Sequence, residues 1–182
     1  MKINKSLLWY FIVLVIATAL YRVIPFRISG FAPNIAFAMF SGAVIKNKGW
    51  AFAFPLLSML LSDVLYQVLF LNGLSPYPGF YDGQILNYLV MASVVIVGFF
   101  MKRINVQNIA LHSLMAPTWF FLLSNFTVWI GSVNIPQTGS GLLATYVAGL
   151  PFYGACIIAS IVFGAIYFGS YYLVLNRKFA KA

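Results

Sequence analysis

Acidic residues are almost absent from this chain, because Asp63 and Asp82 are its two carboxylate side chains among 182 residues. Charged residues of both signs make up 7% of the sequence, whereas soluble domains carry roughly 25%. Apolar residues make up 63%. A water-soluble fold of this length could not bury so much apolar surface, so the composition predicts a protein embedded in a lipid bilayer.

Groups that form disulfides or bind metals are equally scarce. The chain has one cysteine, Cys156, and one histidine, His112, which excludes an intrachain disulfide and a cysteine-cluster metal site. It also lacks a phosphate loop, a nucleophile elbow, a zinc-protease motif and a pair of acids suited to intramembrane proteolysis. We therefore expect neither enzyme activity nor a cofactor nor a metal ion.

Apolar runs divide the chain into six candidate membrane spans. Their predicted ranges are 7–24, 31–45, 51–71, 84–101, 109–132 and 153–175. The second range falls short of the roughly 20 residues that usually cross a bilayer. No soluble domain is present, so the whole chain, 1–182, is predicted to be a single integral membrane domain, an all-α compact bundle of six transmembrane helices.

Two longer connections carry most of the turn-forming residues. The connection 72–83 is rich in glycine, proline and aromatic residues. The connection 133–152, between the fifth and sixth spans, holds glycines and prolines around a short apolar stretch at 142–148. That stretch is too short to span, so we expect a short interfacial or re-entrant helix there.

The distribution of the basic residues predicts the orientation of the bundle. Eleven lysines and arginines give a net charge of +9, and they lie in short clusters between apolar runs. This distribution is typical of topology signals rather than of a nucleic-acid-binding face, so no nucleic acid partner is expected. Nine bases fall on one side of a six-span bundle, which predicts both termini in the cytoplasm and a multi-pass protein of the inner membrane. The nine are Lys2, Lys5, Lys46, Lys48, Lys102, Arg103, Arg177, Lys178 and Lys181.

The two remaining bases, Arg22 and Arg27, lie on the opposite, outer side. Asp63 lies in the outer half of the third span, where an unpaired carboxylate would be costly in lipid. Arg22 ends the first span at a similar depth, and its long side chain can reach toward the third. We therefore predict an ion pair between Arg22 and Asp63.

Further hydrogen-bonding side chains lie at the same depth as this pair. The predicted ligand-binding set consists of Arg22, Asn34, Asp63, Asn87, Asn125, Trp129 and Tyr146, and Gln67, Gln84 and Tyr88 lie nearby in sequence. The pattern favours a pocket that opens outward. The alternative is that these side chains only join helices to one another through hydrogen bonds.

Small residues four apart mark faces on which helices can approach closely. Such pairs include Ala38 and Gly42 on the second span, and Ser160 and Gly164 on the sixth. They indicate packing within the bundle, or alternatively a docking surface for another membrane subunit.

Five stretches, in this order, carry a resemblance to a known family: Y-R-V-I-P, F-A-P-N-I-A-F-A-M-F-S-G-A, P-L-L-S-M-L-L-S-D-V, L-L-S-N-F-T-V-W and T-G-S-G-L-L-A-T-Y-V-A-G-L-P-F. From about residue 21 to 169 the chain resembles a bacterial family of small multi-pass membrane proteins of unknown function. That family is similar to the substrate-binding S components of energy-coupling-factor vitamin transporters.

This resemblance implies a six-helix bundle whose outer pocket binds a small molecule. The residues that would carry over are Arg22, Asn34, Asp63, Asn125, Trp129 and Tyr146. It also implies a coupling transmembrane subunit and ATPases as partners, unless the protein acts alone. The chain departs from the S-component pattern on its first span, where Ala17 and Ala19 lack the alanine spacing typical of docking.

Two functions follow as expectations. The leading one is a substrate-binding membrane component for the uptake of a small, vitamin-like solute. The alternative is a non-catalytic assembly or structural subunit of a membrane complex.

Overall fold

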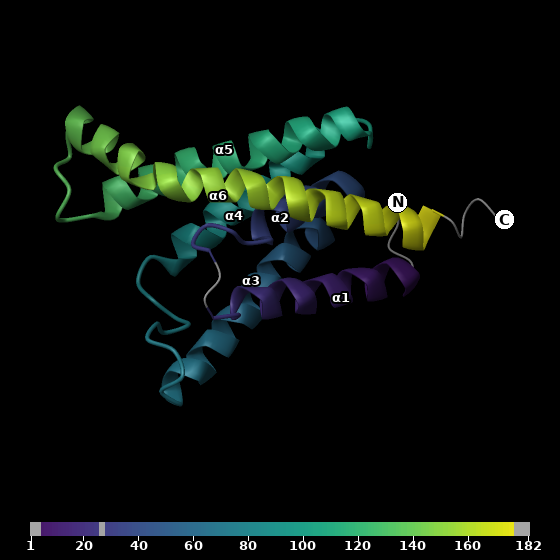
Figure 1. Cartoon of the computed structure of the whole chain (residues 1–182), viewed down its shortest axis with the longest axis horizontal. Coiled ribbons are helices and arrows are strands. Elements are labelled where there is room, and N and C mark those ends of the chain that lie inside the picture. Colours follow the sequence, from purple (N-terminus) through teal and green to yellow (C-terminus); the bar gives the residue numbers. More distant parts are fainter. Residues whose placement is uncertain (1–4, 26–27, 177–182) are drawn as a thin grey trace.

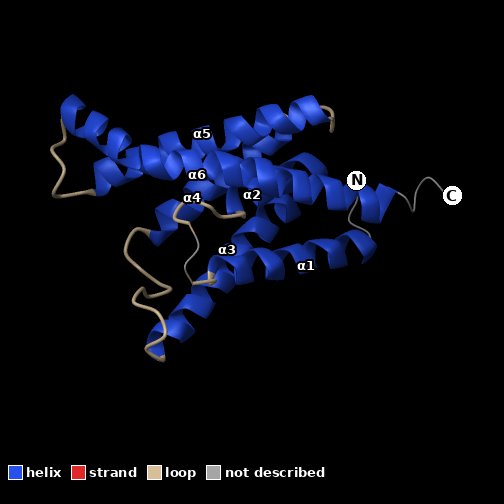
Figure 2. Cartoon of the chain, viewed as in Figure 1, coloured by secondary structure: helices blue, strands red, loops and turns tan. Residues whose placement is uncertain are grey.

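The computed structural model describes residues 5–25 and 28–176. Within these residues the chain forms six α-helices and no strand (Figure 2). The helices are α1 (Lys5–Arg22), α2 (Asn34–Val44), α3 (Lys48–Leu71), α4 (Gln84–Phe99), α5 (Val106–Gly131) and α6 (Gly139–Tyr171), and a π-helical turn, Tyr172–Asn176, follows α6. The predicted all-helical fold is confirmed. Arg27 and four of the nine orienting bases, Lys2, Arg177, Lys178 and Lys181, lie outside the described residues.

Short polar side chains fix where three of the helices begin. The side chains of Asn47, Asn105 and Thr138 accept hydrogen bonds from backbone N–H groups in the first turns of α3, α5 and α6, at 3.2, 2.8 and 3.2 Å. These bonds satisfy N–H groups that have no partner within the helix. The polar residues that interrupt the apolar runs therefore set the helix starts.

Four of the helices are long and apolar enough to cross a membrane: α1, α3, α5 and α6. The other two, α2 and α4, are apolar but shorter. The chain therefore has the helices of a membrane protein. The 11 residues of α2 reach only about 16 Å at the α-helical rise, about half of a hydrocarbon core.

The structure differs from the prediction of a separate short helix at 142–148. Those residues form early turns of α6, which continues through Pro151 to Tyr171. Figure 1 shows this first part of α6, in green, bent away from the rest of the helix. Proline removes one backbone donor and bends a helix, but it does not have to end the helix. One long bent helix therefore replaces the two expected elements.

The centre of the bundle is α2, which packs against α3, α4, α5 and α6. Every residue of α2 is buried except Ala43, which is half-buried. From α1, the Phe11 ring stacks on Phe37 and Phe40 of α2 and on Phe54 of α3, with ring centroids 6.1, 5.4 and 4.9 Å apart. A short apolar helix enclosed in this way is a core helix.

Two glycines allow α2 and α4 to touch along their backbones. A Cβ atom on Gly42 would lie 2.1 Å from the Val95 carbonyl oxygen, and one on Gly98 would lie 2.1 Å from the Met39 carbonyl oxygen. Neither position accepts a side chain without moving a helix. The expected packing role of Gly42 within the bundle is therefore confirmed.

The two ends of the bundle differ. The start of α1 lies against the end of α6, where the Tyr10 hydroxyl donates to the Tyr167 carbonyl oxygen at 3.0 Å and lies 2.7 Å from Ser170 Oγ. We call this the terminal end, and it also holds the connections 45–47 and 100–105. The opposite end, which we call the loop end, holds the connections 72–83 and 132–138 (Figure 1).

Candidate functional site

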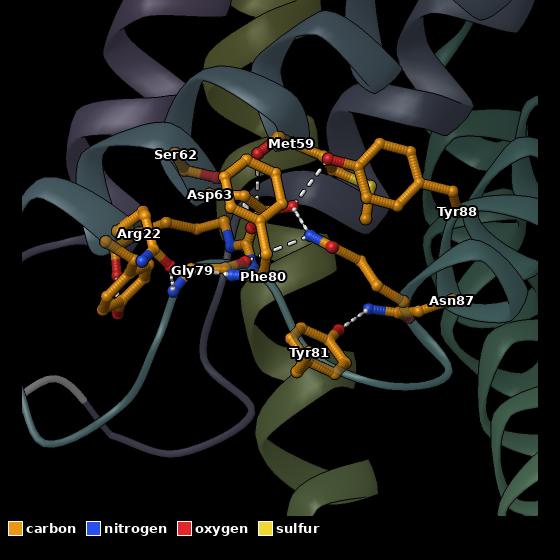
Figure 3. Close-up of polar contacts among 12 residues, drawn as sticks. Arg22, Met59, Ser62, Asp63, Gly79, Phe80, Tyr81, Asn87 and Tyr88 are labelled. Carbon is orange, nitrogen blue, oxygen red and sulfur yellow. Dashed lines mark hydrogen bonds and ion pairs between the residues drawn. The ribbon is translucent and has the colours of Figure 1, made fainter. Parts of the chain in front are cut away.

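A buried ion pair joins α1 to α3 near the loop end (Figure 3). Arg22 Nη1 lies 3.0 Å from Asp63 Oδ1, and the side chains are 17% and 3% exposed. Arg22 also donates to the Ser62 hydroxyl. The predicted pairing is confirmed. Its physical reason is that an uncompensated carboxylate inside a membrane bundle is strongly unfavourable.

The second carboxylate oxygen of Asp63 is held by α4. Gln84 Nε2 donates to Asp63 Oδ2 at 2.7 Å, and the Tyr88 hydroxyl donates to the same atom at 2.6 Å. Gln84 and Tyr88 are four residues apart, so they lie on one face of the first turns of α4. Asp63 thus accepts hydrogen bonds from α1 and α4, and this one side chain ties three helices together.

The connection 72–83 lies across α3 beside this pair, and we call it the strap. Gln67 Oε1 accepts from the backbone N–H groups of Gly79 and Phe80 at 3.0 and 3.3 Å. Gln84 Nε2, which holds Asp63, also donates to the Gly79 carbonyl oxygen at 3.1 Å. The amide side chains of α3 and α4 therefore fasten the strap to the ion pair (Figure 3).

The ion pair and the strap line an open cavity of about 340 Å³. Its lining includes three tyrosines, and the Tyr66 hydroxyl donates to the Arg22 carbonyl oxygen at 2.6 Å. The lining residues are Arg22, Asp63, Tyr66, Tyr77, Pro78, Gly79 and Tyr81. Aromatic walls around a few oriented polar groups are the usual composition of a small-molecule site.

Two further cavities continue from this one along the loop end. The second, of about 430 Å³, shares Tyr81 with the first and is also lined by Asn87, between α4 and α5. The third, of about 380 Å³, shares Val128 with the second and is lined by Asn125 and Thr145, between α5 and α6. The loop end therefore holds three cavities, whose lining residues extend from α1 to α6.

The structure distributes four of the predicted site residues over these cavities. Arg22 and Asp63 line the first cavity, Asn87 the second and Asn125 the third. Asn87 Nδ2 donates to the Tyr81 hydroxyl at 2.9 Å, so it supports a ring of the first cavity (Figure 3). Asn125 Nδ2 donates to the Phe121 carbonyl oxygen within α5, at 2.8 Å.

The other three predicted residues line none of these three cavities. Trp129 Nε1 donates to the Pro136 carbonyl oxygen, and the Tyr146 hydroxyl donates to the Leu122 carbonyl oxygen, both at 3.0 Å. These bonds join one segment of the chain to another, which is the role that the polar residues have in the alternative without a pocket. Asn34 is buried at the start of α2, and among the described residues its Oδ1 has no hydrogen-bond partner.

Several residues of the site were not in the predicted set. From the sequence, Gln84 and Tyr88 are only polar residues near the predicted set, whereas in the structure both bind Asp63 directly. Tyr66 follows Asp63 by three residues, so helical spacing alone places it on a neighbouring face. Tyr77 and Gly79 reach the site through the fold of the strap, for which the sequence offered only its turn-forming residues. Among the described residues, no three His, Cys, Asp or Glu side chains are grouped to hold a metal ion.

The chain matches a family of unknown function (DUF6580) over residues 2–182. The chain belongs to this family, which confirms the expected membership of an uncharacterised family. Neither the comparison with curated proteins nor the comparison with solved structures gives a match.

Proposed function

We propose that this member of a family of unknown function is a membrane component that binds a small solute for uptake, with its binding site in the cavity at Arg22 and Asp63. The observation that carries the proposal is the buried ion pair at the wall of an aromatic cavity near one end of the bundle. Buried charge in membrane helices is unfavourable and is most often found at ligand or ion pathways.

The chemistry of the cavity favours a small solute with a flat body and polar edges, such as a vitamin-like metabolite. The rings of Tyr66, Tyr77 and Tyr81 supply flat apolar surface. The guanidinium of Arg22 supplies a positive group, and the carboxylate of Asp63 is already held in place by three donors. A site whose polar groups are fixed before binding loses less entropy when the ligand arrives. Binding, rather than catalysis, is the proposed role.

We further propose six membrane crossings, both termini in the cytoplasm and the loop end facing outward from the inner membrane. The directions of the helices support this arrangement. Phe11 contacts Phe54 and Arg22 contacts Asp63, so α1 and α3 run parallel, as alternating crossings require. The start of α1 and the end of α6 share the terminal end. The short helices α2 and α4 would cross with the help of their flanking connections.

The resemblance of this family to S components, in size, number of spans and general pattern, suggests how solute binding would lead to uptake. In that scheme the chain associates with a coupling transmembrane subunit and ATPases, or else acts alone. The alternative, a structural subunit of a membrane complex, would need an exposed face of small residues. Ala159, Ser160 and Gly164 are buried inside the bundle, whereas Ala165 and Gly169, also four apart on α6, are exposed and form the face that this alternative would use.

The proposal is tested by mass spectrometry of small molecules that co-purify with the protein in mild detergent, followed by thermal-shift assays with a panel of vitamins. A matched pair of strap variants locates the site. Tyr77 and Leu74 are 72% and 74% exposed on the same connection, but only Tyr77 lines the cavity. Tyr77→Ala should abolish the thermal shift, and Leu74→Ala should preserve it. No co-purified molecule and no shift with any vitamin would favour the structural role.

A further inference from the structure

An apolar groove of about 490 Å³ opens between α5 and α6 at the terminal end, away from the solute cavities. One wall is a single face of the first turns of α5, with Val106, Ile109 and Ala110. The other wall is a face near the end of α6, with Ala165 and Gly169. The small residues of α6 leave room between the helices. The volume lies within the roughly 300–1,000 Å³ of ligand pockets.

Two bases directly precede the chain segment that lines one end of this groove, which we call its mouth. Lys102 and Arg103 are exposed and directly precede Ile104 and Asn105, which line the groove. Asn108 fixes this segment, because its Nδ2 donates to the Arg103 carbonyl oxygen at 2.8 Å and its N–H donates to Asn105 Oδ1 at 2.8 Å. The backbone of Arg103 is thus bound to the first turn of α5.

The charges around the mouth favour an anion. The N-terminus of α5 adds the positive end of a helix dipole to the two bases. The chain's two carboxylates lie at the other end, Asp63 beside the strap and Asp82 within it. An apolar groove with a positive mouth matches a molecule that has a hydrocarbon tail and an anionic head.

We propose that this groove binds an anionic phospholipid, with one acyl chain between α5 and α6 and the phosphate at Lys102 and Arg103. Basic pockets between transmembrane helices attract anionic headgroups, and the attraction increases with each base near the membrane surface. The proposal rests on the membrane placement of the bundle and does not depend on solute binding. Two competing occupants, a zwitterionic lipid and a second copy of the chain, are outcomes of the test.

The headgroup contact is tested by native mass spectrometry of the full chain, titrated with phosphatidylglycerol or phosphatidylcholine of matched acyl chains. We expect phosphatidylglycerol to bind about 30-fold more tightly, which is the effect expected of two bases near one headgroup. Lys102→Gln with Arg103→Gln should remove this preference. Lys46→Gln with Lys48→Gln, which changes two exposed bases elsewhere at the terminal end, should preserve it. Equal binding of the two lipids, or equal loss in both double variants, would overturn the proposal.

The contact with the acyl chain is tested by filling the groove. A Cβ atom on Gly169 or on Gly154 meets nothing within 4 Å, so both positions of α6 accept a side chain. Only Gly169 lines the groove. Gly169→Leu should weaken phosphatidylglycerol binding at least fivefold, because the new side chain takes the place of buried acyl CH2 groups, whereas Gly154→Leu should leave it unchanged. Unchanged lipid binding in Gly169→Leu, or a shift from dimer to monomer mass in that variant, would instead show that the groove does not hold the lipid.

Discussion

The backbone of Gly79 lies directly on that of Asp63, so that a Cβ atom at position 79 would fall 1.8 Å from the Asp63 carbonyl oxygen. Gly79 is buried, and both its N–H and its carbonyl group are bound by glutamine side chains. The position of the strap over the ion pair therefore depends on the absence of one methyl group.

Gly79→Ala should lift the strap from α3. The clash is with backbone atoms, which cannot move aside as a side chain can. We therefore expect the free energy of unfolding to fall by about 1–3 kcal/mol. Hydrogen–deuterium exchange should increase in residues 72–83 and stay unchanged in α5. Gly154→Ala is the control, since its Cβ meets open space. Unchanged exchange in the strap of Gly79→Ala would contradict the close contact.

The ion pair should stabilise the bundle mainly by preventing an unpaired charge. Asp63→Ala removes the carboxylate that pairs with Arg22. We expect the free energy of unfolding, measured by thermal unfolding in detergent, to fall by about 3–5 kcal/mol. Arg22→Met combined with Asp63→Leu should recover most of that loss. Asp82→Ala, at an exposed acid of the strap, should have little effect. If the double variant is as unstable as Asp63→Ala, the two charges do not compensate each other.

The hydroxyl of Tyr88 should contribute through one hydrogen bond to a charged group. Tyr88→Phe removes the donor at 2.6 Å from Asp63 Oδ2 and keeps the ring. Hydrogen bonds to charged groups contribute about 1.5–3 kcal/mol, so the free energy of unfolding should fall by that amount. Tyr172→Phe, at an exposed tyrosine beyond α6, is the matched control. Equal unfolding midpoints for the two variants would show that Asp63 does not need this donor.

The contact between α2 and α4 should tolerate no side chain. Gly98→Leu would drive a side chain into the Met39 carbonyl oxygen, 2.1 Å from the Cβ position. We expect little folded protein on size-exclusion chromatography in detergent. Gly131→Leu, where a Cβ meets nothing within 4 Å, should elute as the wild type does. A monodisperse Gly98→Leu protein would show that the two helices can separate.

The proposed orientation predicts which end reacts with a membrane-impermeant thiol reagent. In a Cys156→Ser background, Leu74→Cys in the strap should be labelled from outside intact cells. Asn105→Cys at the terminal end should be labelled only after the membrane is opened. The reverse pattern would place the strap in the cytoplasm and contradict the proposed topology.

Composition and charge were enough to predict the helical fold and the Arg22–Asp63 pair. The sequence has a single acid inside a span and two bases off the topology pattern, of which Arg22 ends the first span, so few alternative partners remain. The exact partners of Asp63 on α4 were not predictable, because several polar residues share that depth and packing decides which one turns inward. Trp129 and Tyr146 each donate to a backbone carbonyl oxygen, and the sequence does not specify these partners for the same reason. The sequence does not predict the length of α6, because a proline such as Pro151 usually favours a helix break and here only bends the helix.

The enclosure of α2 has a consequence for biosynthesis. Among the described helices, α2 is the second to be synthesised. One of the helices that bury it is α6, which is the sixth. Until then, Gly42 and the neighbouring apolar side chains of α2 must be covered by lipid or by the insertion machinery. Consolidation of the bundle therefore waits for the C-terminal third of the chain, and a truncated product without α6 would present an unfinished core to membrane proteases.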